Sequence, residues 1–346
     1  MNKTKIIASL GAASATKQEI KSLINAGVNV LAFEFQTETI EQHDDRLALV
    51  NELNREQNTF VSTFAYMGPD LKDLDYAVRA QYDFICVYAD NGKKLQEVRN
   101  QINDLGGKDI QLVARLFNEE SLMNIDDIIK VADAVYFNAG KLAEKLELIQ
   151  LPLNQSIVTE KCLQAGKPLI VGNSMLLSMT VTERPMKSEV YDVYNAIKEG
   201  ASALTLNGET MMGKDPSLAV STLMELILAA EEEVDYDLLS KNFYMGKSNE
   251  DAMAQSASQM VNDYDVNVIL ADSKKIAKSL SKYHSYASIV TVVKSDKEAK
   301  SLGLYFGIIP VLSKDAAAEL FIALGLNPAD FVLEVTKNST QLLQLK

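Results

Sequence analysis

The 346-residue chain is long enough for one large domain and a second, smaller one. Its formal net charge of -13 predicts a surface that repels phosphate backbones and anionic lipid, so we expect no nucleic acid partner and no membrane partner. Cys86 and Cys162 each lie in or beside an apolar segment, which predicts buried free thiols rather than a disulfide framework. No apolar run reaches the roughly 20 residues of a membrane helix, and the chain start lacks a signal-peptide pattern. We therefore expect a cytoplasmic protein.

Short runs rich in β-branched and aromatic residues recur along the first two thirds of the chain, and each is followed by a charged segment with helical period. Several of these segments end in Gly, which helix C-termini favour. Eight such units are the number in a closed parallel barrel. The pattern therefore predicts an α/β protein with a (β/α)8 TIM barrel rather than an open doubly wound sheet. The expected strands are residues 5–11, 29–35, 59–66, 83–89, 110–116, 134–138, 168–173 and 203–209.

The acidic run EEEVDYD at 231–237 interrupts this alternation. We take it as a boundary, which predicts a barrel domain over 1–235 and a second domain over 236–346. Beyond the run, helical segments alternate with the expected strands VNVILA (266–271), SIVTVV (288–293), GIIPVL and FVLEV. The second domain is therefore predicted to be a smaller α/β sandwich.

Active sites of such barrels form at the C-terminal ends of the strands. Read in order, these ends carry the segments TKIIASLGAAS, AGVNVLAFEF, MGPDLK, AGKPLIVGNSMLLSM and ERPMKSEVYDVYNAIKEG, followed by GETMMGKDP. They resemble the successive blocks of the pyruvate kinase family from residue 4 to about residue 225. The most specific part is RPxxxEVxDVxNAxxxG followed by GETxxGxxP. The resemblance implies a glycolytic kinase, a transferase that moves a phosphoryl group between phosphoenolpyruvate and ADP with magnesium and potassium.

Two departures from the family pattern concern the active site. The family inserts a β-rich lid domain after its Gly-Pro block, whereas here Gly68-Pro69 is soon followed by the next expected strand. The family's catalytic Lys and metal-binding Glu at the fifth strand align with Arg115 and Phe117. Further family positions, for metal, substrate, phosphate and potassium, are also replaced; the residues there are Lys141, Asn173, Ala32, Glu34, Gln36, Ala65 and Met67.

These replacements remove the chemistry that phosphoryl transfer needs. Positioned cations neutralise the charge of the transferring group, but a Phe cannot ligate magnesium and a Lys repels it. We therefore assign no catalytic residue, no metal site and no cofactor, and expect pyruvate kinase activity to be absent.

Arg115 and Lys141 leave two interpretations open. They can balance charge internally, by pairing with Glu34, Glu119 or Glu209. Alternatively they form an anion pocket with Asn173, in which Arg115 offers a planar donor fork and Lys141 a point charge to a small phosphate or carboxylate.

The segment ADSKKIA at 271–277 aligns with the family's effector loop, which holds a sugar phosphate. Ser273, Lys274 and Lys275 are the candidate ligands there, because backbone amides are free at a helix N-terminus. The alternative is a simple helix cap formed by Asp272 or Ser273.

The leading hypothesis is a catalytically degenerate relative, a pseudoenzyme that binds a ligand or regulates. The alternative is an active or residually active pyruvate kinase, so the sequence leaves open whether the protein is an enzyme. The resemblance also implies a homo-oligomer, since the family helix with the RPxxxEVxDVxNA pattern lies at a subunit contact. Arg184, Pro185, Glu189, Asp192 and Asn195 match that pattern.

Overall fold

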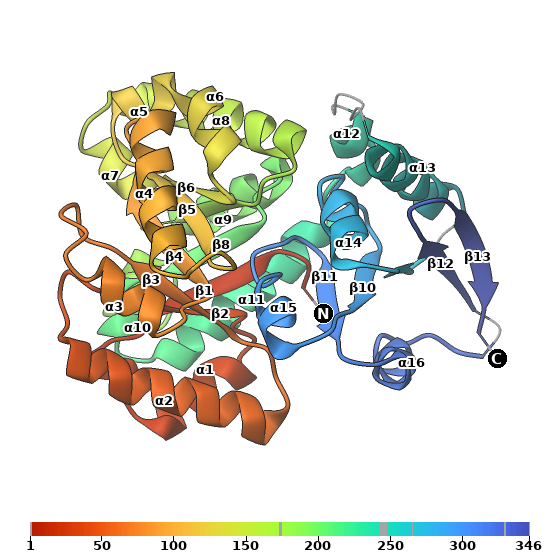
Figure 1. The fold of residues 1–346 in the computed structure, drawn as a ribbon, viewed down its shortest axis with the longest axis horizontal. Helices are drawn as coiled ribbons and strands as arrows, with labels where there is room; N and C mark the ends of the chain where they lie inside the picture. The colour runs from red at the N-terminus through yellow and green to blue at the C-terminus, as the bar shows by residue number, and fades with distance from the viewer. Residues whose placement is uncertain (1, 173–174, 242–247, 265, 329, 346) are drawn as a thin grey trace.

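The fold is that of a computed structural model, which describes residues 2–172, 175–241, 248–264, 266–328 and 330–345. Eight parallel strands close into a barrel, because β1 pairs with both β2 and β8 (Figure 1). The predicted TIM barrel is therefore confirmed. The strands are β1 Lys5–Ser9, β2 Val30–Glu34, β3 Ser62–Tyr66, β4 Phe84–Tyr88, β5 Gln111–Leu116, β6 Ala134–Asn138, β7 Leu169–Gly172 and β8 Ala203–Leu206.

Helices connect the strands and cover the outside of the barrel (Figure 1). Several helices begin at a capping residue. At the start of α1, for example, the Thr16 side chain accepts a hydrogen bond from the Glu19 N–H. Gly200 ends α9 with φ 106°, a left-handed conformation that suits glycine. The helices are α1 Lys17–Asn25, α2 Ile40–Gln57, α3 Leu74–Arg79, α4 Gly92–Asp104, α5 Glu119–Met123, α6 Ile125–Val131, α7 Ala139–Ala143, α8 Leu151–Ala165, α9 Lys187–Glu199, α10 Gly208–Met211 and α11 Pro216–Glu232, with 3-10 turns η1 Ala12–Ser14, η2 Leu148–Gln150 and η3 Leu177–Thr180.

The C-terminal domain is a five-stranded sheet in the order β11-β10-β9-β12-β13, flanked by helices (Figure 1). Only β12 and β13 pair in antiparallel fashion. The sequence pattern missed β13, because the strand has only five residues and its two leucines, Leu342 and Leu343, are adjacent and give no alternation. The elements are α12 Tyr236–Lys241, α13 Asn249–Tyr264, β9 Val268–Ala271, α14 Lys274–Ser281, β10 Ser288–Val292, α15 Asp296–Lys300, β11 Ile308–Val311, α16 Lys314–Ala323, β12 Phe331–Val335 and β13 Thr340–Gln344. No helix in these described ranges has the length and apolar character to cross a membrane.

The barrel interior is sealed at its N-terminal end by the C-terminal domain. Leu304, fully buried, belongs to the same apolar cluster as Ile7, Phe64 and Phe84 inside the barrel. Gly303 lets this segment approach β3, since a Cβ there would lie 2.2 Å from the Ser62 Oγ. The Ser62 Oγ in turn donates to the Lys300 carbonyl at 2.7 Å. The two domains therefore share part of one core.

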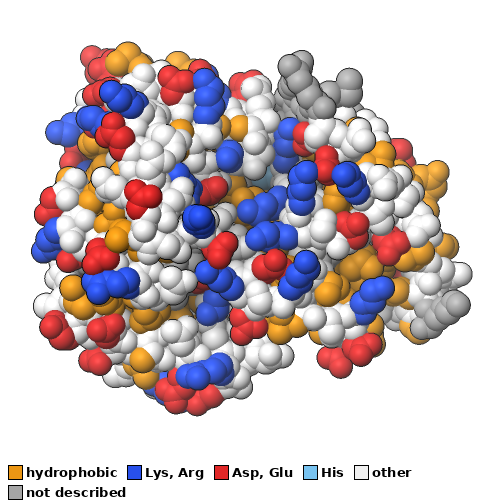
Figure 2. Space-filling view, viewed as in Figure 1, with side chains coloured by type: hydrophobic (Ala, Val, Ile, Leu, Met, Phe, Trp, Pro, Cys, Tyr) orange, Lys and Arg blue, Asp and Glu red, His pale blue; other side chains and the backbone are white. Residues whose placement is uncertain are grey.

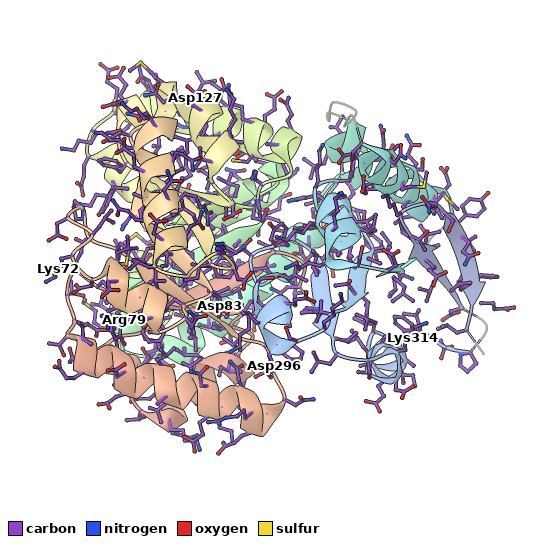
Figure 3. All side chains as sticks on the ribbon, in the orientation of Figure 1. Lys72, Arg79, Asp83, Asp127, Asp296 and Lys314 are labelled. Atoms are coloured by element: carbon purple, nitrogen blue, oxygen red, sulfur yellow. The ribbon has the colours of Figure 1, made fainter. Side chains whose placement is uncertain are left out.

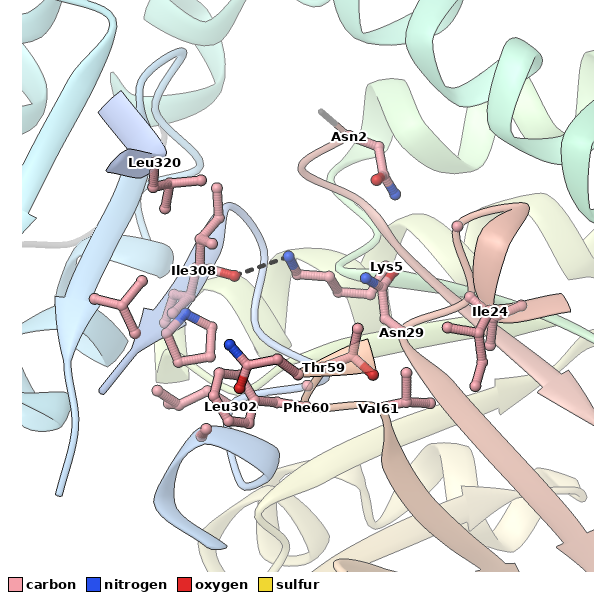
Figure 4. A pocket seen from close by; sticks show the side chains of 18 of the residues that line it. Asn2, Lys5, Ile24, Asn29, Thr59, Phe60, Val61, Leu302, Ile308 and Leu320 are labelled. Carbon is pink, nitrogen blue, oxygen red and sulfur yellow. Dashed lines mark hydrogen bonds between the residues drawn. The ribbon is translucent and has the colours of Figure 1, made fainter. Parts of the chain in front are cut away.

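A cavity of about 790 Å³ lies beside this junction, between the barrel end and β11 with α16 (Figure 4). Its wall is mostly apolar, but Lys5 on β1 points across it, and the Lys5 Nζ donates to the Ile308 carbonyl at 2.9 Å. Figure 3 places Asp83 at the same end of the barrel, toward α15 and its Asp296. Burial, opposed by the charge of Glu231, lowers the pKa of Lys5 from 10.5 to about 8.

Replacing Lys5 with Met is expected to stabilise the protein at pH 7 by about 1 to 2 kcal/mol, because burying the ammonium costs more than its one hydrogen bond returns. The folded-state pKa lies below the unfolded value, so wild-type stability rises between about pH 8 and pH 10.5. The advantage of Lys5→Met should therefore shrink across this window. Urea unfolding at several pH values measures it, with the exposed Lys93→Met as control; equal stability of Lys5→Met and wild type throughout would contradict the argument.

Candidate functional site

Arg115, in β5, lies at the C-terminal mouth of the barrel among three tyrosine rings, which we call the tyrosine cage. Its guanidinium carbon is 5.4 Å from the ring centre of Tyr66, 4.9 Å from that of Tyr88 and 5.4 Å from that of Tyr136. Guanidinium groups bind aromatic faces by cation–π attraction, worth about 0.5 to 2 kcal/mol each. The cage therefore holds the cation in place without neutralising its charge.

Strand register builds this arrangement. Arg115 is aligned with Tyr88 on β4 and with Tyr136 on β6, so the two rings flank it from the neighbouring strands. Tyr66 ends β3, one strand further, and its hydroxyl lies 3.3 Å from the Thr205 Oγ1 across the barrel. Residues of a parallel barrel that point inward at the same level form a layer. The cage adds a cation, from β5, to the side chains at this end of the barrel.

The positive charge of Arg115 has no anionic partner in contact. The residue is only 9% exposed, and its Nε has no hydrogen-bond acceptor within the described part of the chain. No carboxylate of the described residues lies within 4.0 Å of the guanidinium, and Glu34 acts on it only through longer-range attraction. A buried cation without a paired anion is unfavourable. The positive charge at the mouth is therefore not balanced by a described carboxylate in contact with it.

Glu34, the last residue of β2, is a carboxyl group whose charge acts on Arg115. Burial raises the pKa of Glu34 to about 7, with Arg115 opposing and Glu38 adding to the shift. The Asn207 Nδ2 donates to the Glu34 Oε1 at 3.4 Å and to the Ser9 Oγ at 2.9 Å. Near neutral pH this carboxyl is thus only partly ionised and neutralises Arg115 incompletely.

Glu209, in the segment Asn-Gly-Glu-Thr at 207–210, forms structural hydrogen bonds. One of its carboxylate oxygens accepts from the Leu176 N–H at 3.1 Å and the other from the Asn207 N–H at 2.9 Å. Burial raises the pKa of Glu209, and these backbone bonds oppose the shift. The Glu209 carboxylate thus ties the Leu176 backbone to the Asn207 backbone.

The mouth does not fit the magnesium that the family resemblance implies. Magnesium prefers carboxylate oxygens, but Phe117 packs edge-on against Tyr88, with ring centres 4.9 Å apart. Glu34 shares its region with Arg115, and both oxygens of Glu209 are engaged. The described residues contain no group of three or more His, Cys, Asp or Glu side chains placed to hold a metal ion.

The two described residues of the predicted anion pocket, Arg115 and Lys141, have different partners. Lys141 lies on α7, 44% exposed by side chain, and its Nζ pairs with Glu144 at 2.9 Å. Neither Lys141 nor Arg115 has an ion pair with Glu34, Glu119 or Glu209 among the described residues. Asn173 lies outside the described residues. Of the two described members of the set, Arg115 lies inside the mouth and Lys141 pairs with Glu144 at the surface.

The three effector-loop candidates have three separate surroundings. The Ser273 Oγ caps α14 by accepting from the Ile276 N–H at 3.5 Å, as the helix-cap alternative expects. Lys275 pairs with Glu250 at 2.7 Å. Lys274 turns toward the Ser301 Oγ, 3.5 Å from its Nζ.

Sequence reasoning missed the tyrosine cage and Asn207 as parts of the mouth. A signal existed, since Tyr66 ends its expected strand, Tyr88 is the last residue but one of its own, and Tyr136 lies within the next strand but one. Strand-end aromatics on either side of the Arg115 strand would have indicated a cation–π site. The inward orientation of each ring depends on strand register, which the sequence does not specify by itself.

Comparison with known proteins identifies relatives over most of the barrel. The chain matches the family described as pyruvate kinase, barrel domain, over residues 1–71 and 57–220. A pyruvate kinase of Clostridium perfringens is 33% identical over 247 residues, 69% of this chain and 52% of the relative. One of Clostridium acetobutylicum is 29% identical over 261 residues, 74% of this chain and 55% of the relative. The chain spans about half the length of these curated relatives.

A solved structure of similar fold covers both domains. It is a crystal structure of a pyruvate kinase from Cryptosporidium parvum, with a TM-score of 0.93 and 18% identity. The alignment covers 100% of this chain and 96% of that one. At this identity the likeness concerns the fold alone.

Proposed function

Since this chain belongs to the pyruvate kinase family, we propose that it is a catalytically degenerate member whose barrel mouth binds a small carboxylate or phosphate. The observation that carries the proposal is Arg115, a buried cation held by three tyrosine rings without a paired carboxylate among the described residues. Its planar fork suits a carboxylate or phosphate, which would supply the missing negative charge.

The alternative, an active or residually active pyruvate kinase, is supported by the names of the relatives. The side chains at the mouth argue against it, because Phe117 and Arg115 take the positions that the resemblance gives to a metal-binding Glu and a catalytic Lys. The segment 67–83 between β3 and β4 contains α3 and no lid. A cytoplasmic location and a regulatory role stay predictions.

Homo-oligomerisation also stays a prediction. One residue of the matching helix has an internal role, because the Glu189 carboxylate accepts from the Ser178 N–H at 2.7 Å and the Met186 N–H at 2.8 Å. On the same helix Tyr191 is 55% exposed, and the Lys187 Nζ lies 5.5 Å from its ring centre.

A thermal-shift screen of carboxylates and phosphates without added metal tests the mouth. A ligand at about a hundred times its Kd should stabilise the fold by about 2.7 kcal/mol, a shift of several degrees for a chain of this size. The shift should decrease with added salt, since charge attraction supplies much of the binding. A flat response across the whole panel would exclude a small-anion site at the mouth.

The pH dependence of anion binding at the mouth should follow the ionisation of the Glu34 carboxyl. A bound anion near Glu34 repels its ionised form, so affinity should fall as pH rises through about 7. Glu34→Gln removes this repulsion and should bind a dicarboxylate such as malonate with little change between about pH 6.5 and pH 8.5. Isothermal titration of both proteins measures this; identical pH profiles would show that Glu34 does not face the ligand.

A further inference from the structure

Two ionisable side chains of opposite charge face the barrel mouth without pairing with each other. Arg115 on β5 follows Val113 by two residues. Glu34 on β2 follows Ala32 by two residues. Both preceding residues belong to the apolar cluster inside the barrel, so the alternation of side chains along a strand turns Arg115 and Glu34 inward as well. The two side chains therefore face the same space from strands three apart in the barrel.

The tyrosine cage keeps the two charges apart. Tyr66, whose ring centre lies 5.4 Å from the Arg115 guanidinium carbon, is aligned with Glu34 on the neighbouring strand. Arg115 and Glu34 form no ion pair within 4.0 Å. The hydrogen bond that the Glu34 carboxyl has among the described residues comes from the Asn207 Nδ2, at 3.4 Å. Neither charge therefore has a described counter-ion in contact with it.

Charged side chains elsewhere on the barrel do pair with one another. Figure 2 shows Lys and Arg side chains next to Asp and Glu side chains at several places on the visible face. Lys94 pairs with Asp90 at 2.6 Å, for example, and Lys141 with Glu144 at 2.9 Å. Arg115 is instead enclosed by three rings, and it cannot reach Glu34 without leaving them.

Asn207 adds a buried acceptor to the mouth. Its Nδ2 donates to the Ser9 Oγ at 2.9 Å and to the Glu34 Oε1 at 3.4 Å, because an ionised carboxylate requires the donor side of the amide. The Asn207 Oδ1 is buried and has no hydrogen-bond partner in the described part of the chain. A buried acceptor without a donor is unfavourable. A ligand that donates to this oxygen would remove the penalty.

The chemistry of the donor follows from what surrounds it. A hydroxyl group supplies one donor and no charge, whereas an ammonium group supplies three donors and a positive charge. An ammonium group can therefore bond the Asn207 Oδ1 and the Glu34 carboxylate together, and it neutralises the latter. The Arg115 Nε, which is buried and has no described acceptor, suits a carboxylate on the same ligand.

We propose that the mouth binds an α-amino acid as a zwitterion, with its carboxylate on Arg115 and its ammonium group between Glu34 and the Asn207 Oδ1. The inference rests on the proposed function, because it specifies which small carboxylate the mouth prefers. An α-amino acid carries the two charged groups on one carbon, so it fits between opposite charges that face each other without touching. Phosphate and simple carboxylates would leave Glu34 and the Asn207 Oδ1 without a partner.

Calorimetric titration of the full chain at pH 8 without metal tests the preference. Glycine, glycolate and acetate share a carboxylate and differ by an ammonium group, a hydroxyl group or a hydrogen atom. Glycine should bind at least about tenfold more tightly than acetate, with glycolate between them, since the ammonium group adds charged hydrogen bonds. Arg115→Leu should weaken binding of glycine by about tenfold or more, which places the ligand at the mouth.

Glu34→Gln gives a readout that general damage to the mouth would not produce. At pH 8 this variant removes a negative charge that attracts the ammonium group of glycine and repels the second carboxylate of malonate. It should therefore weaken glycine by about tenfold and strengthen malonate. The exposed Glu41→Gln on α2 is the matched control and should change neither affinity. If Glu34→Gln fails to fold by circular dichroism, Asn207→Ala replaces it and should weaken glycine more than acetate.

Glycine and malonate should also respond to pH in opposite directions. Burial raises the pKa of Glu34 to about 7, and a bound ammonium group would lower this pKa again. The affinity for glycine should therefore rise by up to about tenfold between about pH 6 and pH 8, as Glu34 becomes ionised. Binding near pH 7 should release protons, so the measured heat depends on the ionisation enthalpy of the buffer. Glu34→Gln should lose this dependence.

The outcomes separate this inference from the function on which it rests. Acetate or glycolate binding as tightly as glycine would refute the amino acid preference and leave the small-anion function in place. Absence of any heat or thermal shift with glycine at about 50 mM, while malonate binds, would do the same. Glycine binding that survives in Arg115→Leu would put the amino acid at another site and also refute the proposal. No response to the whole panel of carboxylates and phosphates would refute the proposed function itself.

Discussion

In a lactate dehydrogenase-coupled assay with phosphoenolpyruvate, ADP, magnesium and potassium, the protein is expected to form pyruvate at least about 10⁴-fold more slowly than an active pyruvate kinase. Phosphoryl transfer depends on positioned cations and bound metal, and Phe117 occupies a position that the resemblance gives to a metal ligand. No lid follows β3 to exclude water, because α3 alone lies between β3 and β4.

A paired variant strengthens this test. Arg115→Lys combined with Phe117→Glu restores two family residues but neither the lid nor the acidic residue at the position of Lys141, so it should also remain inactive. Turnover by the wild type near about one per second, in the range of ordinary enzymes, would refute the degenerate assignment if Arg115→Leu abolished it.

Arg115→Leu is expected to weaken binding of a small anion at the mouth by about a hundredfold or more, because it removes a buried cation whose donors are the main attraction. Leu keeps apolar contact with the tyrosine cage, so the fold should persist. Arg115→Lys should recover only part of the loss, since an ammonium lacks the planar fork. Calorimetry with the best ligand of the thermal-shift screen measures all three proteins.

Two controls locate the effect. Arg55→Leu removes an exposed arginine from α2 and should leave the affinity unchanged. Lys141→Ala should have a small effect, because its amine already pairs with Glu144 at the surface. A loss in Lys141→Ala as large as in Arg115→Leu would show instead that Lys141 leaves Glu144 to reach the ligand, as the sequence interpretation expects.

The barrel could be predicted because two local sequence signals recur along the first two thirds of the chain. Apolar β-branched runs such as residues 29–35 and 168–173 alternate with helices whose ends carry Gly166 or Gly200 in left-handed conformations. Eight repeats then leave few other topologies. The antiparallel strand β13 was not predictable in this way, because its five residues show no alternation of apolar and polar side chains, and the strand is defined by its pairing with β12.

The location of the mouth could be predicted from the sequence, but the contacts of its side chains could not. Arg115 was placed there because strand ends of a parallel barrel converge. The orientation of Lys141 was not predictable, since its choice between the mouth and Glu144 depends on the backbone path of the short helix α7. Lys5 was also missed, because a lysine at the start of an apolar run gives no sign that a second domain will bury it.

The burial of Leu304 inside the barrel has a consequence for synthesis of the chain. All eight barrel strands have left the ribosome once Leu206 has emerged, but the residue that seals their interior is made about 100 residues later. At about 5 to 20 residues per second, the nascent barrel waits about 5 to 20 seconds with Ile7, Phe64 and Phe84 open to water at one end. During that interval the unsealed end offers an apolar surface to a chaperone, and it closes when the segment containing Gly303 and Leu304 docks against β3.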